Sequence, residues 1–211
     1  MIHPSVATLA LILPPPPVDV KGEYQIQVPP PLPECGGDRF DWEEITARTG
    51  WRYPADYRCF LETYGAGGDI AGTIGVVETP HPADVEYHVD RLDLYPPPDG
   101  LRRWGCDDVA DDFFWRCIDP DPDDWTVAVH TRDRRNGQRW FDYPMGMVDF
   151  LTGLLNGSLD VPLGVRLRPG SPQAPHTYQS WRVHDLQMRA EYPDFKGTWA
   201  PLNLPNRYYE A

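Results

Sequence analysis

The stretch from Trp51 to Gly68 reads WRYPADYRCFLETYGAGG and predicts one short amphipathic helix together with both of its ends. Pro54 suits a first helical turn, where a backbone N–H is not needed. Four large apolar side chains recur at the i, i+3, i+4, i+7 spacing of a single face, namely Tyr57, Phe60, Leu61 and Tyr64. Gly65 then ends the helix. So dense a stripe must pack against another layer, so we expect a core element without catalytic residues.

The regions on either side of this helix predict further elements. Asp41 and Glu44 form a capping-box pattern at the start of a short helix that Gly50 ends. Beyond the glycine loop, residues 71–77 are typical of a strand weakened by glycine. Residues 83–94 fit a helix better than a strand.

From Leu101 onward the pattern becomes that of an antiparallel sheet. Residues 112–118 and 125–131 alternate as strands, with Phe113 and Trp115 on one face and Phe114 on the other. Asn136-Gly137 predicts a hairpin into a strand over residues 139–143. Residues 147–155 form a helical stripe closed by Asn156-Gly157. The order of elements predicts an α+β fold, an antiparallel sheet with helices packed against it.

Composition divides the chain into three regions. Residues 1–37 are proline-rich and are interpreted as an N-terminal arm or linker outside the core. Residues 38–161 form the folded domain. Residues 162–211 are aromatic but broken by proline and glycine, which favours an irregular arm packed on the domain, with one short strand around residues 178–184. The apolar run at residues 6–13 is too short to span a bilayer and lacks the features of a signal peptide.

Charge and cysteine content exclude several functions. The 211 residues carry 19 basic and 32 acidic side chains, a net charge of −13. Nucleic acids and anionic membranes are therefore not expected partners, whereas a basic protein is. The four cysteines lie far apart without a CxxC pair. We therefore expect reduced thiols, no metal ion, no cofactor and a cytoplasmic location.

Four segments in order carry a family resemblance: PADYRCFLETYGAGG, LRRWGCDDVADDFFW, DDWTVAV and MGMVDFLTGLLNG. Over residues 40–160 they resemble the SMI1/KNR4 (SUKH) superfamily, although Tyr53 stands where the family has an aliphatic residue and Ala110-Asp111 where Asn-Gly is frequent. The positions that match the family motifs are Pro54, Asp56, Tyr57, Tyr64, Gly65, Gly68, Trp104, Gly105, Asp112, Trp115, Trp125, Phe150, Leu151 and Gly157.

The resemblance implies an α+β interaction module rather than an enzyme. Bacterial members are mostly immunity proteins that bind and neutralise a secreted toxin, often a nuclease, and fungal members are scaffolds. We therefore expect an immunity protein that occludes the active cleft of a basic toxin. The alternative is a regulatory scaffold or adaptor that uses the proline-rich and C-terminal arms.

Aspartates cluster at both ends of the predicted strand over residues 112–118. The segment 107–125 holds eight of them and a single arginine: Asp107, Asp108, Asp111, Asp112, Asp119, Asp121, Asp123 and Asp124. A strand of this length spans about 23 Å, so the two groups do not form one compact patch unless the loops fold back. They are either solvated turns or an acidic surface that engages the basic toxin cleft. A third interpretation is calcium bound by the DxDxD spacing from Asp119.

Other chemistry has weaker patterns. Cys59 or Cys106 with His130 would be a thiol–imidazole pair, but no nucleophile elbow, P-loop or HExxH motif accompanies them. The tryptophans of the predicted sheet either pack in the core or act as exposed anchors for a protein partner; they are Trp104, Trp115, Trp125 and Trp140.

Overall fold

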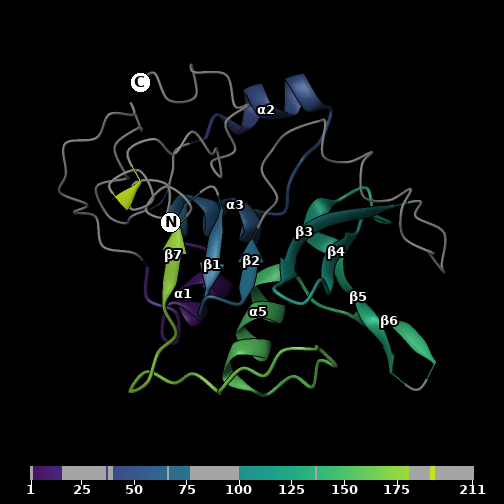
Figure 1. Ribbon diagram of the computed structural model, residues 1–211. Coiled ribbons are helices and arrows are strands. Elements are labelled where there is room, and N and C mark those ends of the chain that lie inside the picture. The colour runs from purple at the N-terminus through teal and green to yellow at the C-terminus, as the bar shows by residue number, and fades with distance from the viewer. Residues whose placement is uncertain are drawn as a thin grey trace.

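The computed structural model describes residues 2–15, 37, 40–65, 67–76, 100–135, 137–180 and 191–192. Within them an antiparallel seven-stranded sheet has the order β6-β5-β4-β3-β2-β1-β7, so the chain forms a meander from β1 to β6 and adds β7 at the β1 edge (Figure 1). The strands are β1 Gly68–Ile70, β2 Ile74–Val76, β3 Leu101–Asp107, β4 Asp112–Arg116, β5 Thr126–Arg135, β6 Gln138–Tyr143 and β7 Tyr178–Ser180. The predicted sheet is confirmed.

Helices pack on this sheet. They are α1 Pro4–Leu9, α2 Trp42–Thr49, α3 Ala55–Tyr64 and α5 Met147–Asn156, with a 3-10 turn η1 at Pro122–Asp124. Asp41 accepts a hydrogen bond from Glu44 N at 2.9 Å, and Gly50 ends α2 with a φ of 73°. These ends confirm the capping prediction. Pro54 differs slightly, since it precedes the first turn of α3 instead of lying inside it.

The predicted strand over residues 71–77 is only partly correct. Its first residues form the turn of a hairpin between β1 and β2, in which Ala71 and Gly72 have positive φ values of 55° and 68°. The sequence does not predict the strand β1, because it begins with a glycine, Gly68, and glycine is not typical of strands. A Cβ at this position would lie 2.5 Å from the Gln179 carbonyl oxygen of β7, so the close pairing of these strands requires glycine. The helix expected over residues 83–94 lies outside the described residues.

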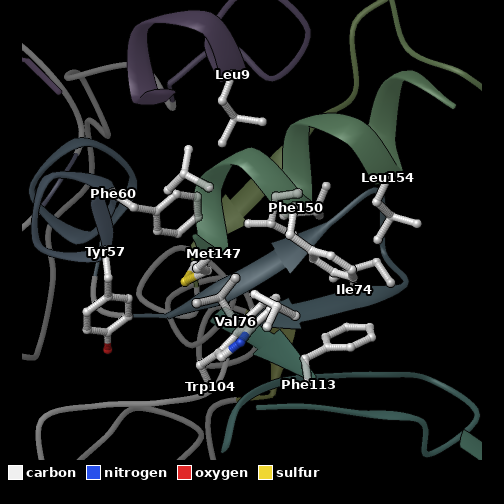
Figure 2. Packing of buried hydrophobic residues seen from close by; sticks show 14 of the residues in the cluster. Leu9, Tyr57, Phe60, Ile74, Val76, Trp104, Phe113, Met147, Phe150 and Leu154 are labelled. Atoms are coloured by element: carbon white, nitrogen blue, oxygen red, sulfur yellow. The ribbon is translucent and has the colours of Figure 1, made fainter. Parts of the chain in front are cut away.

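The hydrophobic core lies between one face of the sheet and the helices α1, α3 and α5. Figure 2 shows Leu9 of α1 on the side of Phe60 and α5, away from the sheet. Phe150 of α5 faces the sheet, where its ring contacts those of Trp104 and Phe113. The alternation predicted for β4 is confirmed, because Phe113 and Trp115 belong to this core. Phe114 joins a smaller cluster on the opposite face, with Leu101, Ala128 and Trp140. The α+β class follows from these two layers.

The N-terminal residues correct the expectation that residues 1–37 stay outside the core. Val6, Leu9 and Leu13 are fully buried, and the Leu13 carbonyl accepts a hydrogen bond from the Tyr64 hydroxyl at 2.5 Å. The apolar run that is too short for a membrane is thus a helical stripe packed on α3 and α5. Residues 16–36 lie outside the described part of the chain.

The region after residue 161 packs on the domain as expected. Leu163 is buried, and β7, Tyr178–Ser180, supplies the part of the predicted short strand that falls within the described residues. His176 fixes this region to the N-terminal segment and to α5, because its backbone N–H donates to Ile12 O at 2.7 Å and its ring contacts Leu155 O at 3.1 Å. Of the remaining C-terminal residues only 191–192 are described.

Candidate functional site: an acidic loop at the start of α3

The two groups of aspartates lie at opposite ends of β4, as their spacing predicted. Asp107, Asp108, Asp111 and Asp112 surround the β3–β4 turn, whereas the other group forms the loop of residues 119–124 after β4. Their exposure differs. In the first group only Asp108 is exposed, while every aspartate of the second group is exposed.

Asp107 and Asp111 have structural roles, and their prediction as partner-binding residues is wrong. Their exposed fractions are only 5% and 2%. The Asp111 carboxylate accepts hydrogen bonds from Arg132 N at 2.7 Å and Gly164 N at 2.8 Å, so it joins β5 to the C-terminal region. Asp107 accepts from Val109 N and Asp111 N and closes the turn. Burial raises the pKa of Asp107 to about 6, against the lowering effect of these hydrogen bonds.

Asp112 is also held within the fold. Its carboxylate lies 2.6 Å from Arg103 Nε on the neighbouring strand, and its side chain is only 17% exposed. An ion pair across two strands fixes this carboxylate in place. The β3–β4 turn therefore leaves Asp108 as its only exposed carboxylate among the predicted residues.

The loop of residues 119–124, which we call the acidic loop, is held by its own side chains. Asp119 accepts a hydrogen bond from Asp121 N at 2.9 Å, and Asp121 accepts one from Asp123 N at 3.1 Å. The Trp125 indole donates to the Asp119 carbonyl at 2.8 Å, and Pro122 is buried. Such side-chain to backbone bonds favour one turn conformation, so the exposed carboxylates are presented in a fixed arrangement.

The acidic loop is attached to the start of α3. Asp123 accepts a hydrogen bond from Ala55 N at 2.6 Å and so caps a helix 68 residues away in sequence, for which Pro54 offers no side-chain cap. Arg52 Nη2 donates to the Pro120 carbonyl at 2.7 Å. A carboxylate at a helix N-terminus is stabilised by the helix dipole, which offsets part of the repulsion within the loop.

A pocket of about 520 Å³ lies beside this attachment. The acidic loop contributes Asp121 and Asp123, and α2 contributes Trp42 and Glu43. Arg52, Tyr53 and Arg58 line the remaining sides. The pocket therefore combines aromatic rings with charges of both signs and joins residues 42–58 to the acidic loop, which is distant in sequence.

An aromatic wall lies behind this pocket. The guanidinium of Arg102 lies 4.9 Å from the Trp51 ring centre and 4.6 Å from that of Tyr53, and it donates a hydrogen bond to the Tyr53 hydroxyl. Arg102 is almost completely buried. Tyr53, which departs from the family motif, thus supplies both a ring and a hydroxyl to a buried guanidinium, a favourable pairing of a cation with an aromatic face.

A smaller cavity of about 170 Å³ lies on the other side of Asp123 and Pro54. At this place Asp56 links α3 to α5, since its carboxylate accepts hydrogen bonds from Tyr57 N at 2.6 Å and Val148 N at 3.0 Å. A Cβ on Gly146 would lie 2.9 Å from this carboxylate. Burial raises the pKa of Asp56 despite these bonds. The family-motif residue Asp56 is therefore a helix cap.

The remaining motif positions build the core and its turns. Every aromatic or aliphatic motif side chain is buried, namely Tyr57, Tyr64, Trp104, Trp115, Trp125, Phe150 and Leu151. Gly105 permits close strand pairing, because a Cβ there would lie 2.7 Å from the Gly75 carbonyl oxygen. Trp140 is buried as well. The sheet tryptophans therefore pack inside the molecule, and the interpretation of them as exposed anchors is wrong.

The thiol–imidazole pair is not formed by Cys106 and His130. Asp112 is in register with both residues, so β4 separates them by two strand spacings, about 10 Å. Burial raises the pKa of the Cys106 thiol and lowers that of His130, which opposes an ion pair. The Cys59 sulfur accepts a hydrogen bond from His3 N at 3.2 Å.

The DxDxD spacing of the acidic loop is also typical of a calcium-binding loop. Among the described residues, His, Cys, Asp and Glu side chains form no group of three or more that could hold a metal ion. In the loop itself, one oxygen each of Asp119, Asp121 and Asp123 faces a backbone N–H donor. Asp119 and Asp121 thus bind backbone N–H groups of the loop itself, whereas Asp123 binds one of α3.

Sequence reasoning missed the pocket residues Trp42, Glu43, Arg52 and Arg58, and the capping role of Asp123. No local pattern marks them, because the pocket forms only where residues 42–58 meet the acidic loop. Within the described chain, every helix is too short or too polar to cross a bilayer. A scan against protein-family models found no match, and neither did searches of curated proteins and of solved structures.

Proposed function

We propose that this chain is a non-enzymatic protein-binding module of the SMI1/KNR4 type, an immunity protein that neutralises a secreted basic toxin in the cytoplasm. The acidic loop would cover the toxin's active cleft, taking the place of a phosphate-bearing substrate. The ordered sequence motifs support the family, and the α+β sheet is compatible with it.

The observation that carries the proposal is the fixed geometry of the acidic loop. Four exposed aspartates lie within six residues, hydrogen bonds from Ala55 and Arg52 hold the loop against the start of α3, and one from Trp125 closes the loop. Because the loop is ordered before binding, association need not include the entropy cost of ordering it. A concentrated negative potential also accelerates encounter with a basic partner.

The proposal is tested with a toxin domain encoded by a neighbouring open reading frame. Asp119, Asp121 and Asp124 are replaced by asparagine, which keeps the loop's hydrogen-bond acceptors. We expect the association rate constant to fall about tenfold at low salt and to lose most of its salt dependence, while dissociation changes less. The matched control is D108N, a single exposed aspartate at the other end of β4. Equal association kinetics of the triple variant and the wild type would refute the proposed role of the loop.

The alternative function is an adaptor that joins proteins through its terminal arms. It is tested by a deletion within the N-terminal arm, residues 1–37. Removing the whole segment would also remove the buried side chains of Val6, Leu9 and Leu13. Deleting residues 16–36 alone leaves these side chains in place. An immunity protein keeps its affinity for the toxin after this deletion, whereas an adaptor that uses the proline runs loses a partner.

A further inference from the structure

The pocket between α2, the start of α3 and the acidic loop has the size of an anchor site. Its volume of about 520 Å³ is in the range of pockets that take a ligand or a long side chain of a partner protein. Binding energy in protein interfaces concentrates where a large side chain, frequently arginine, fills such a pocket next to less important contacts. The acidic loop borders the pocket directly through Asp121 and Asp123.

We propose that this pocket receives one basic side chain, arginine or lysine, of the bound protein. The inference rests on the proposed function, because it assigns the anchor of the same acidic surface. It names the chemistry that the partner presents: a cationic side chain at the centre of its contact surface.

The carboxylates of the pocket favour a cationic occupant. Glu43 is exposed and makes no hydrogen bond or ion pair with the described residues. Asp121 and Asp123 each use one oxygen for a backbone N–H, which leaves a second oxygen for a ligand. Carboxylates that keep open acceptor positions can receive the N–H groups of a guanidinium or ammonium.

The aromatic side of the pocket favours the same occupant. Trp42 and Tyr53 lie next to one another, with ring centres 5.9 Å apart, and both line the pocket. Cations are attracted to aromatic rings, and Trp is the strongest partner among them. The Tyr53 ring is already covered by Arg102 and stacks on Tyr57. The half-buried Trp42 is therefore the ring that an occupant of the pocket can reach.

Two arginines in the pocket repel a basic occupant. Replacing one of them therefore tests whether the ligand is basic or acidic. Arg52 donates to the Pro120 carbonyl, so part of its hydrogen-bonding capacity is used. Arg58 has a buried Nε without a hydrogen-bond partner among the described residues. An occupant with a carboxylate or phosphate would gain from Arg58, whereas a basic occupant gains when Arg58 is removed. The sign of the R58Q effect therefore identifies the class of ligand.

In the experiment the full-length protein carries isotope-labelled tryptophan, and three blocked tripeptides are added to it in turn. The NMR resonances of the indole N–H groups report binding. The probes are acetyl-Gly-Arg-Gly-amide, its neutral citrulline analogue and acetyl-Gly-Glu-Gly-amide. We expect the arginine probe to shift the Trp42 resonance, assigned with W42F, with a dissociation constant of about 1–10 mM. The citrulline and glutamate probes are expected to bind at least about fivefold more weakly, since each lacks the positive charge.

Variants test the charges of the pocket. The double variant E43Q/D121N is expected to raise the dissociation constant of the arginine probe about fivefold to tenfold, and R58Q is expected to lower it about threefold. D108N, at the far end of β4, is the matched control and leaves the constant unchanged. The proposal would be overturned if the glutamate probe bound more tightly than the arginine probe, or if R58Q weakened binding of the arginine probe. It would also be overturned if no probe shifted the Trp42 resonance.

The outcome is separable from that of the proposed function. If the toxin binds with normal affinity to E43Q/D121N, the immunity role stands and the anchor assignment fails. If the arginine probe behaves as expected but no toxin is bound, the anchor assignment stands and the immunity role fails.

Discussion

The β3–β4 turn and the acidic loop each contain four aspartates, yet the fold uses them in opposite ways. In the turn, Asp107 and Asp111 are directed inward and bind backbone N–H groups, and Asp112 pairs with Arg103. In the loop, the carboxylates stay exposed while some of them also cap the backbone. The comparison teaches that local charge density does not determine whether an acidic cluster is a binding surface. What decides is whether backbone donors of other segments surround it.

The largest effect is expected at Asp111. Replacement by alanine leaves the N–H groups of Arg132 and Gly164 without their acceptor in the interior, so the free energy of unfolding should fall by about 3–4 kcal/mol. Urea denaturation of D111A measures this loss, with D124A as the loop control, expected within about 0.5 kcal/mol of wild type. Similar losses for both variants would abolish the distinction between the two regions.

A smaller, pH-dependent effect is expected at Asp107. Its pKa is raised by burial to about 6 in the folded state, from the ordinary value of 3.8. The folded state therefore binds this proton more tightly than the unfolded chain, and the free energy of unfolding falls as pH rises from about 4 to about 6, by about 2 kcal/mol. Below this window the penalty is absent, and above it the penalty is complete.

The variant D107N removes this titration and provides the reference. Urea denaturation at intervals from pH 4 to pH 7 should show that the stability difference between wild type and D107N changes across the window. A constant difference would mean that Asp107 is not desolvated in the way its exposed fraction of 5% implies.

Asp123 belongs to the exposed loop but shares the structural role of the turn, so its expected effect is intermediate. D123A removes the cap at Ala55 N and should lower the free energy of unfolding by about 1 kcal/mol. D123N keeps an acceptor oxygen and should lose less. Thermal unfolding of both variants tests the cap, and equal stability of D123A and wild type would show that the loop is not attached to α3 through this bond.

The smallest effect on stability is expected for the triple variant of Asp119, Asp121 and Asp124. These carboxylates repel one another, and their replacement by asparagine keeps the capping oxygens. The free energy of unfolding should therefore change by less than about 0.5 kcal/mol, with a slight gain at low salt. A loss of more than 1 kcal/mol in calorimetry would assign the loop a structural role like that of the turn.

Much of the fold could be predicted from local sequence patterns. The stripe of Tyr57, Phe60 and Tyr64 predicts α3, and the alternation around Phe113 and Trp115 predicts β4 with its correct faces. Hydrophobic periodicity depends only on residues close together in sequence, so it can be recognised without tertiary information. The β1–β2 hairpin was not predicted. Gly68 is required because β7 packs too closely for a Cβ, and this requirement cannot be recognised from neighbouring residues.

The candidate site was only partly predictable. The acidic loop and its charge are evident from the sequence, but its attachment to α3 depends on Asp123 and Ala55, which lie 68 residues apart. The pocket likewise joins Trp42 and Arg58 of the consecutive helices α2 and α3 to Asp121 of the distant acidic loop. Long-range contacts of this kind leave no periodic signal, so only the packed chain reveals them.

The sequence by itself determined the α+β class, the helix ends at Gly50 and Gly157, and the negative charge of both aspartate groups, since each depends on residue type and short-range spacing. The tertiary structure alone decided that α1 belongs to the core, that Asp107 and Asp111 are buried and that the acidic loop borders a pocket. The physical reason is that burial and hydrogen bonding of a carboxylate depend on which donors the rest of the chain brings to it.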